Sequence, residues 1–543
     1  MRTRRPIQRR SQRRAPVPGH RLPDAPGRSF RRRVAAAVAV AVVFPAAIAV
    51  PAGGASLRDI NGDGSDDLLI GVPLEDLGSR RDAGLVHVVL GPSAAMRPRF
   101  GGFLRQGGPI AGKPRPGDAF GGSVELVDID GDGHADAVIG SPGERVGPHT
   151  RAGVVHVVPG GPRGLRRAAA VRLVEGRDGL PGTPRPDNAF GWDLASGDFD
   201  GDGFGDIAIS AVGERAGGAT VAGAVTVVMG SADGIDPGRS TQFSQAGAIG
   251  GQPADGDSFG RSMAVGDFDG DGFDDLAIGV PGERVRRQGD AGAVNVLYGS
   301  ETGLGTEGNQ RFTQPLLRGR AQAGDLFGFA VAAVDLDCDG FDELAIGSPN
   351  EDLGNDPNTG IVQVIGGSPD GLDRRDVVRL AAGRRGLPGA RANAGFGKAL
   401  AGADLGSDGC GDLIVGAPFA TVDDRAGAGA VYVVRGGPRW SDEVEAQLVA
   451  GRRALGRTPA PGDFFGSSLA VLDWNGDGRD DVAIGVPGAD VDGKRDAGQL
   501  VILEGARNRL RPGQRTVLTQ GGRLANRAET GDQFASTLQD ALS

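Results

Sequence analysis

The clearest chemistry in this sequence is a nine-residue acidic stretch that begins at Asp198 and ends at Asp206. Carboxylates occupy its positions 1, 3, 5 and 9, and a glycine occupies position 6. So many negative charges repel one another unless a cation lies between them. Carboxylate oxygens suit Ca²⁺, which takes about six to eight oxygen ligands, and glycine permits the sharp turn that folds a loop around an ion. The stretch therefore predicts a calcium-binding loop, with the backbone carbonyl of position 7 as a further ligand.

The acidic stretch occurs seven times, at steps of 68 to 70 residues, and we number these loops one to seven. The predicted side-chain ligands are, loop by loop, Asp59, Asn61, Asp63 and Asp67; Asp128, Asp130, Asp132 and Asp136; Asp198, Asp200, Asp202 and Asp206; Asp267, Asp269, Asp271 and Asp275; Asp335, Asp337, Asp339 and Glu343; Asp404, Asp408 and Asp412; and Asp473, Asn475, Asp477 and Asp481. Loop six has Gly406 at position 3, so we expect its site to be weak or empty. The alternative is a set of polar turns that bind no metal.

The loops do not fit an EF-hand. An EF-hand needs an acidic ligand at position 12 and flanking helices, whereas position 12 here is apolar, as at Ile70, Ile139 and Ile209. Position 2 is always apolar and is expected to pack beneath the loop; it is occupied by Ile60, Ile129, Phe199, Phe268, Leu336, Leu405 and Trp474.

Short strands must position these loops. In the second repeat, apolar runs at 123–127, 137–140, 153–158 and 171–173 are separated by glycine, proline and the acidic loop. Such runs, with no helical period, predict a four-stranded antiparallel sheet. Repeated seven times, the sheet predicts an all-β fold, a seven-bladed β-propeller. The period of about 69 residues is longer than the roughly 40–50 residues of common propeller repeats.

The two ends of the repeat region complement each other. A Phe-Gly pair lies eight residues before every acidic loop except the first. Residues 531–538 match residues 117–124, yet no acidic loop follows them. We therefore expect the C-terminal segment to supply the innermost strand of the first blade and to close the ring, with Phe534 buried like Phe120.

The combined motif resembles the FG-GAP repeat of integrin α-chain propellers and of bacterial integrin-like proteins. It consists of Phe-Gly, then Asp-x-Asp-x-Asp-Gly-x-x-Asp, then Gly-Ala-Pro, which is present literally at Gly416-Ala417-Pro418. Five other repeats carry close variants, beginning at Gly71, Gly140, Gly279, Gly347 and Gly485, whereas the third departs with Ser210-Ala211-Val212. The resemblance covers 57–543. It implies calcium in hairpin loops on one face and ligand binding on the opposite face, without identifying the ligand.

The N-terminal segment has the composition of an export signal. Residues 1–33 contain twelve arginines and one acid, for a charge of +11, and the apolar run 34–50 ends near Ala47-Ile48-Ala49. This pattern predicts an export signal over residues 1–55 and the propeller over 56–543, with a single membrane anchor as the alternative. We expect a secreted or cell-surface protein without a membrane span once the signal is removed. Subtracting +11 from the net charge of −10 leaves −21 for the rest, which argues against nucleic-acid binding.

The two cysteines lie in neighbouring loops, Cys338 in loop five and Cys410 in loop six. A disulfide between them would tie down the loop that lacks a ligand, provided that the Cα atoms lie within about 7 Å. Two free thiols are the alternative.

No catalytic group stands out. All five histidines precede residue 157, and the seven repeats leave no separate catalytic domain. Ser123, Ser262 and Ser468 recur in register and are expected to be structural. Glu144-Arg145 and its equivalents at 214–215 and 283–284 are expected to be exposed ion pairs in loops on the face opposite calcium, with recognition of a charged ligand as the alternative. The sequence thus favours a secreted, calcium-binding, non-catalytic recognition or adhesion module for an extracellular protein or glycan. The alternatives are an extracellular hydrolase with a site in the axial funnel and a structural surface protein.

Overall fold

The computed structural model describes residues 58–92, 99–384, 386–389, 392–442, 444–522, 524 and 526–538. The chain divides into two compact units, 1–54 and 55–543, and the account below concerns the second. The export signal predicted for 1–55 lies outside the described residues. Within the described part, no helix is long and apolar enough to cross a membrane.

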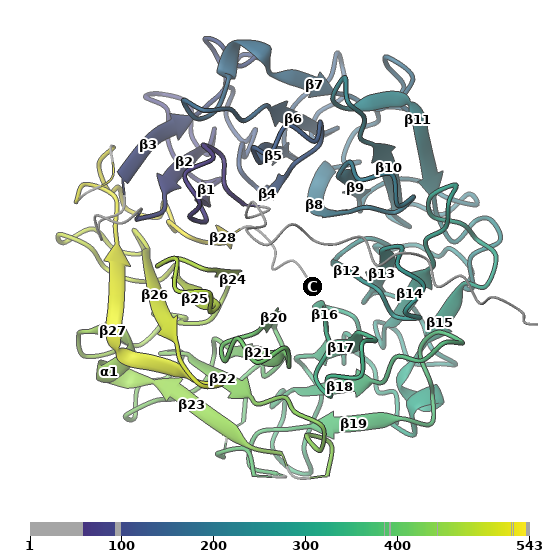
Figure 1. Cartoon of the computed structure of the whole chain (residues 1–543), viewed down its shortest axis with the longest axis vertical. Coiled ribbons are helices and arrows are strands. Elements are labelled where there is room, and N and C mark those ends of the chain that lie inside the picture. The colour runs from purple at the N-terminus through teal and green to yellow at the C-terminus, as the bar shows by residue number, and fades with distance from the viewer. Residues whose placement is uncertain are drawn as a thin grey trace, which may run out of the picture. The chain divides into compact units, whose positions relative to one another are not determined.

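Seven four-stranded antiparallel sheets form the blades of a β-propeller, as predicted (Figure 1). Blade one follows the order β28-β1-β2-β3, and in every other blade the four strands follow one another in the chain. The strands, grouped by blade from the axis outward, are β28 (Thr537–Leu538), β1 (Leu68–Val72), β2 (Leu85–Leu90) and β3 (Arg99–Leu104); β4 (Ser123–Val127), β5 (Asp136–Ser141), β6 (Val154–Val158) and β7 (Val171–Leu173); β8 (Phe190–Gly197), β9 (Asp206–Ala211), β10 (Ala224–Met229) and β11 (Asp236–Phe243); β12 (Met263–Gly266), β13 (Asp275–Val280), β14 (Ala293–Leu297) and β15 (Gln310–Phe312); β16 (Val331–Val334), β17 (Glu343–Ser348), β18 (Ile361–Ile365) and β19 (Val377–Leu380); β20 (Ala399–Ala403), β21 (Asp412–Ala417), β22 (Ala430–Val434) and β23 (Ala446–Ala450); and β24 (Leu469–Leu472), β25 (Asp481–Val486), β26 (Gln499–Gly505) and β27 (Leu510–Leu518).

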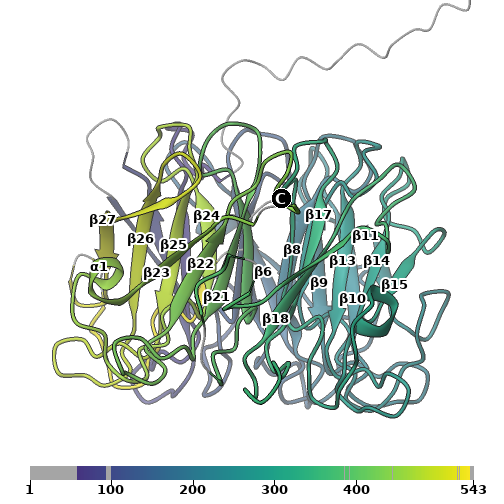
Figure 2. The same cartoon turned by 90° about the horizontal axis from the view of Figure 1, so that it is seen from below.

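The second and third strands of each blade are its most apolar parts, because both of their faces are covered by neighbouring blades. In blade two, every residue of β5 and β6 is buried, and Ile139 lies opposite His156 in the ladder. Such two-sided burial gives continuous apolar runs instead of an alternating pattern. The described residues include one short α-helix, α1 (Gly451–Leu455), beside the last two blades (Figure 2).

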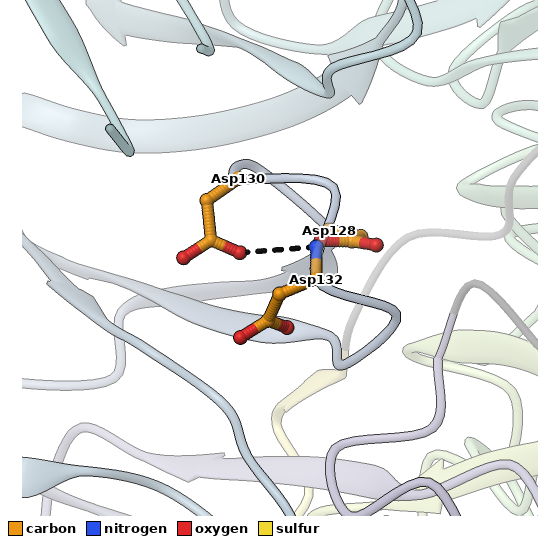
Figure 3. Close-up of side chains that lie close together, drawn as sticks. All are labelled: Asp128, Asp130 and Asp132. Carbon is orange, nitrogen blue, oxygen red and sulfur yellow. Dashed lines mark hydrogen bonds between the residues drawn. The ribbon is translucent and has the colours of Figure 1, made fainter. Parts of the chain in front are cut away.

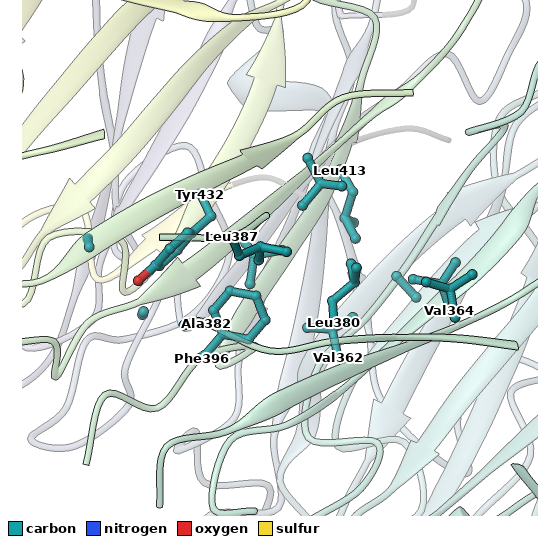
Figure 4. Packing of buried hydrophobic residues seen from close by; sticks show 14 of the residues in the cluster. Val362, Val364, Leu380, Ala382, Leu387, Phe396, Leu413 and Tyr432 are labelled. Carbon is teal, nitrogen blue, oxygen red and sulfur yellow. The ribbon is translucent and has the colours of Figure 1, made fainter. Parts of the chain in front are cut away.

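The hydrophobic core lies between blades. The cluster shared by blades five and six joins Leu380 and Val364 of one blade to Leu413 and Tyr432 of the next, with Phe396 among them (Figure 4). The repeated phenylalanines are all fully buried; they are Phe120, Phe190, Phe259, Phe327, Phe396, Phe465 and Phe534. Burying one such ring stabilises the fold by roughly 1.5–3 kcal/mol, so the Phe-Gly motif holds each blade to its neighbour.

The seam between the last blade and the first has the same construction. β28 pairs antiparallel with β1, placing Leu538 opposite Ile70. Phe534 and Leu538 share a core cluster with residues of blades seven and one. The Phe534 amide donates to the Ala497 carbonyl at 3.0 Å. These contacts confirm the predicted ring closure.

Serine and threonine hydroxyls join the inner ends of neighbouring blades. The donors lie at or just before the first strand, and each acceptor is a carbonyl two residues before the equivalent position of the next blade. The bonds are Ser123 Oγ to Gly191 O (2.9 Å), Ser262 Oγ to Gly328 O (3.0 Å), Ser468 Oγ to Ala535 O (2.7 Å) and Thr537 Oγ1 to Gly121 O (2.8 Å). The structural role expected for these serines is confirmed.

The expected exposed Glu-Arg pairs are wrong. Glu144 is only 4% exposed; it accepts from Gln106 of the preceding blade and pairs with Arg172 of its own blade, not with Arg145. Glu283 repeats this arrangement with Gln245 and Arg311. The sequence suggested adjacent partners, whereas the sheet brings the true partners from the neighbouring blade and the outer strand.

Candidate functional site

The acidic loops lie between the first and second strands of the blades, all at the same end of the strands. Position 1 begins each loop in the same way: one carboxylate oxygen accepts the backbone N–H of the position-6 glycine. The donor–acceptor distances span 2.6–3.1 Å in the loops that begin at Asp59, Asp128, Asp198, Asp267, Asp335, Asp404 and Asp473. The position-6 glycines have φ between 76° and 89°, a region that side chains disfavour. The predicted turn is therefore present in all seven loops.

Position 2 anchors each loop, as predicted. All seven of its side chains are buried, from Ile60 to Trp474. This fixes the backbone beneath the loop and leaves the acidic side chains at positions 1, 3 and 5 to face the loop interior or solvent.

Position 9 has a structural task that the sequence does not reveal. One oxygen of Asp136 accepts the Gly160 N–H at 2.7 Å, which ties the second strand to the end of the third. Five other loops repeat this bond, through Asp67, Asp206, Asp275, Asp412 and Asp481, at 2.8–3.0 Å. Burial raises the pKa of these carboxyls, to about 7 at Asp136 and about 8 at Asp275 and Asp481. In Glu343 of loop five, burial and the nearby Asp337 raise the pKa to about 9.

Four loops gather three carboxylates with ligand atoms within 4.8 Å of one another. In loop two these are Asp128, Asp130 and Asp132, which converge around the turn (Figure 3). The other groups are Asp198, Asp200 and Asp206; Asp267, Asp269 and Asp271; and Asp335, Asp337 and Asp339. These are loops two to five, three of which carry four aspartates.

The donor set fits a hard cation such as Ca²⁺. Four buried carboxylate oxygens in the loops lack a hydrogen-bond partner among the described residues: Asp63 Oδ1, Asp128 Oδ1, Asp337 Oδ1 and Asp412 Oδ2. Unpartnered buried anionic oxygens are costly, and a cation bound between them would remove that cost. In loops one and seven the position-3 asparagine donates Nδ2 to the position-9 carboxylate, at 3.1 Å for Asn61 and 3.0 Å for Asn475.

Arginines outside the loops contact three of them, and Arg479 pairs with Asp477 within loop seven. Arg99 pairs with Asp63 in loop one and Arg239 with Asp200 in loop three. Arg166 Nη2 lies 3.5 Å from Asp130 and 3.3 Å from Asp132 in loop two. These arginines are about half exposed, so they can swing away when a cation takes over the carboxylates.

Neighbouring loops are linked to each other. The position-8 amide donates to the position-1 carbonyl of the preceding loop, as from Asp274 to Asp198 at 3.2 Å. Where position 8 is aspartate, its carboxylate also accepts the backbone N–H of position 1 of the preceding loop: Asp274 Oδ2 accepts the Asp198 N–H at 2.7 Å. A Cys338–Cys410 disulfide with a Cα–Cα distance of 4.9 Å joins loops five and six, so of the two open alternatives the structure selects the disulfide. The sequence analysis did not consider position 8, although aspartate recurs there.

The opposite end of the propeller contains a pocket of about 490 Å³ around the axis. It is lined by the residue two places after each repeated phenylalanine, which lies just before the first strand or, for Trp192, near its start, and so at the end of the blade away from the acidic loop. These residues are Gly122, Trp192, Arg261, Phe329, Lys398, Ser467 and Ser536. The sequence analysis missed them, although they carried a signal: this position varies in chemistry directly after a nearly constant glycine.

Cations and aromatic rings alternate along one side of this axial pocket. The Arg261 guanidinium carbon lies 5.0 Å from the Trp192 ring centroid and 4.7 Å from that of Phe329. Lys398 Nζ lies 4.2 Å from the Phe329 centroid and 5.5 Å from that of Phe419. Burial lowers the pKa of both Arg261 and Lys398. The other side of the pocket presents Ser467 and Ser536.

Comparison with curated proteins finds integrin α subunits. The chain is 32% identical to integrin alpha-5 of Xenopus laevis over 238 residues, which is 43% of this chain and 20% of the relative. It is 30% identical to integrin alpha-PS2 of Drosophila melanogaster over 42% of this chain and 15% of the relative. Integrin alpha-7 of Rattus norvegicus is 46% identical over 111 residues, or 20% of this chain and 9% of the relative. The chain thus spans a fifth or less of the length of these relatives.

Among solved structures, the exotype rhamnogalacturonan lyase YesX matches with a TM-score of 0.37 and 13% identity, over 86% of this chain and 80% of that one. A similarity this weak carries no argument about activity. The FG-GAP repeat model matches residues 50–89, 120–158, 190–228, 259–297, 327–365, 396–434 and 465–503. The first segment includes β1 and most of β2, each later segment spans all or most of the first three strands of a blade, and together the seven cover half of the chain. The chain therefore belongs to the FG-GAP repeat family, as an integrin-like seven-bladed β-propeller.

Proposed function

We propose that this protein is exported and acts outside the cell as a calcium-stabilised recognition module that binds an acidic glycan without catalysing a reaction on it. The axial pocket is the observation that carries the proposal. It combines the positive charges of Arg261 and Lys398 with the rings of Trp192 and Phe329. Cations pair with carboxylate or sulfate groups, and flat aromatic faces pack against the apolar face of a sugar ring. Pockets of this size, with few charged groups among apolar ones, are typical of ligand sites.

The two ends of the propeller have separate roles in this proposal. The acidic loops at one end hold cations and stabilise the blades, while the pocket at the other end takes the ligand. The integrin α relatives favour recognition over catalysis, since the likeness spans the repeats that build both ends.

Ligand binding is tested with the intact protein in Ca²⁺ on an array of uronic-acid, sulfated and neutral glycans. We expect binding to acidic glycans, and we expect Lys398→Ala and Trp192→Ala to weaken it about tenfold or more. Ser467→Ala, on the other side of the pocket, is the matched control. Equal binding by the wild type and Lys398→Ala, or release of cleaved glycan, would contradict the proposal. If the protein binds an acidic peptide more strongly than every glycan, the ligand is a protein instead of a glycan.

Calcium stabilisation is tested by calorimetry in EDTA and in millimolar Ca²⁺. A site whose free Ca²⁺ is a hundredfold above the dissociation constant adds about 2.7 kcal/mol to the free energy of unfolding. We expect the melting temperature to rise with Ca²⁺, and we expect Asp128→Asn and Asp269→Asn to reduce the rise. Identical melting curves, or a larger rise with Mg²⁺, would refute calcium binding.

Export is tested by mass spectrometry of the protein from culture medium. The proposal expects a mature chain that begins between residues 50 and 56, after the Ala47-Ile48-Ala49 segment. An intact Met1 on protein that stays in the cytoplasm would exclude export.

A further inference from the structure

Loop six has lost its position-3 ligand but gained a side chain from the neighbouring blade. Gly406 stands where the other loops carry aspartate or asparagine. Asn508, in the turn between β26 and β27 of blade seven, points into this place: a Cβ on Gly406 would collide with Asn508 Oδ1. Asn508 Nδ2 donates to Asp408 Oδ2 at 3.1 Å, and Asn508 is only 8% exposed. Its carboxamide therefore fills the vacant position-3 space.

This contact resembles the loops that carry asparagine within their own sequence. In loops one and seven, the position-3 asparagine ties its Nδ2 to a loop carboxylate, Asp67 or Asp481. Asn508 ties its Nδ2 to the loop carboxylate of Asp408. With Asn508 included, loop six has three aspartates and one carboxamide, the same donor set as loops one and seven.

A buried oxygen in loop six points independently to a cation ligand. In loops one to five, the second oxygen of the position-9 carboxylate accepts the position-2 amide, at 2.6–3.4 Å. In loop seven it accepts Asn475 Nδ2. Asp412 is fully buried, yet its Oδ2 has no partner with hydrogen-bond geometry among the described residues, although the Leu405 amide still favours the charged carboxylate. A buried carboxylate oxygen left in this state is stabilised by a cation.

We propose that loop six is a complete divalent-cation site whose position-3 ligand is Asn508 of blade seven, with Asp404, Asp408 and Asp412 as the carboxylate ligands. The proposal rests on calcium binding by the loops, and it replaces the expectation from sequence that this site is weak or empty. Blades six and seven already hold the parts in register: Asp480 Oδ2 accepts the Asp404 N–H at 2.7 Å, and the disulfide fixes Cys410. A cation here would bridge two blades, unlike one held within a single hairpin.

The local backbone allows a clean test. Asn508 has a φ of 61°, which glycine tolerates, so Asn508→Gly removes the carboxamide without straining the turn. Gly406 has no left-handed φ, so an aspartate can replace it once Asn508 has been removed. Arg509, an exposed neighbour, provides the control Arg509→Ala.

The experiment counts bound Ca²⁺ per chain by native mass spectrometry of the intact, disulfide-bonded protein, alongside isothermal titration. We expect Asn508→Gly to bind one ion fewer than the wild type, Gly406→Asp/Asn508→Gly to regain it, and Arg509→Ala to match the wild type. Asn508→Asp, which keeps a ligand oxygen, is expected to retain the ion and also serves if the glycine variant folds poorly.

If Asn508→Gly binds as many Ca²⁺ ions per chain as the wild type, the proposal is overturned, because Asn508 would then only donate a hydrogen bond to Asp408 and would not bind the ion. Failure of the double variant to regain the ion would place the lost ion outside loop six and would also overturn it. If the wild type binds no Ca²⁺ at any loop, the proposal that calcium stabilises the protein is wrong. The number of ions bound by the wild type distinguishes this result from the two outcomes above.

Discussion

The position-9 carboxyls link the state of the loops to pH. Burial raises the pKa of Asp67, Asp136 and Asp206 to about 7 and that of Asp275 to about 8. The ordinary pKa of aspartate is near 4, so in the absence of metal the folded protein binds these protons more tightly than the unfolded chain does. Their contribution to stability is full below about pH 4 and is lost progressively as the pH rises from about 4 to the folded pKa of about 7 to 8.

We therefore expect the protein in EDTA to melt at a higher temperature at about pH 6 than at about pH 8. In Ca²⁺ this difference should shrink or reverse, because a cation favours the charged carboxylates. Scanning calorimetry at both pH values, with and without Ca²⁺, measures it. His87 and His156 act in the opposite direction, since burial lowers the pKa of each to about 4, but their effect falls mainly below pH 6.5. A metal-free protein that is more stable at pH 8 would contradict the expectation.

At the scale of elements, the disulfide joins two hairpin loops from different blades. Cys338 and Cys410 are 72 residues apart in the chain, and a crosslink closing a loop of this length typically stabilises a protein by about 2–4 kcal/mol. One of its cysteines, Cys410, belongs to loop six, so the disulfide also limits the movement of the Asp404–Asp412 segment.

We expect Cys410→Ser to lower the free energy of unfolding by about 2–4 kcal/mol. Cys338→Ser should cost about the same, and the double variant no more than either single one, because all three remove the same bond. Denaturant unfolding in the presence of Ca²⁺ measures these losses. Additive losses from the two single variants would show that each cysteine matters by its own packing instead.

The strands and their order could be predicted because the repeat fixes them. The phenylalanine, the acidic loop and the apolar second strand recur at nearly constant spacing. The strands assigned in one repeat can therefore be assigned in the other six. Apart from the disulfide, side-chain contacts between blades could not be predicted, because they join residues with no fixed spacing from the motif. The partners of Glu144, the position of Asn508 and the alternation of Arg261 with Trp192 all depend on which side chains the ring brings together.

At the scale of the whole molecule, stability depends on one short segment. Phe534 and β28 supply the core and the inner strand of the seam, and Thr537 donates across to blade two. Without them, β1 becomes an exposed edge, and such edges promote aggregation.

Deleting residues 530–543 should therefore destabilise the entire propeller and produce aggregates instead of fraying one end. Phe534→Ala alone should cost about 3–5 kcal/mol, as truncation of a buried ring does. Deleting only 539–543, which leaves β28 whole, is the control. Light scattering and thermal melting measure both effects; a monomeric deletion variant with the wild-type melting temperature would show that the seam does not depend on this segment.

The pairing of β28 with β1 also means that blade one cannot be completed until β28 has been synthesised. A ribosome adds about 5–20 residues per second, so roughly half a minute or more separates the appearance of β1 from that of its inner partner. Throughout that interval blade one has only three of its four strands, however well the later blades have formed. A nascent chain therefore stays an open arc until its last segment emerges, and any prematurely terminated product displays the same unpaired edge to chaperones and proteases.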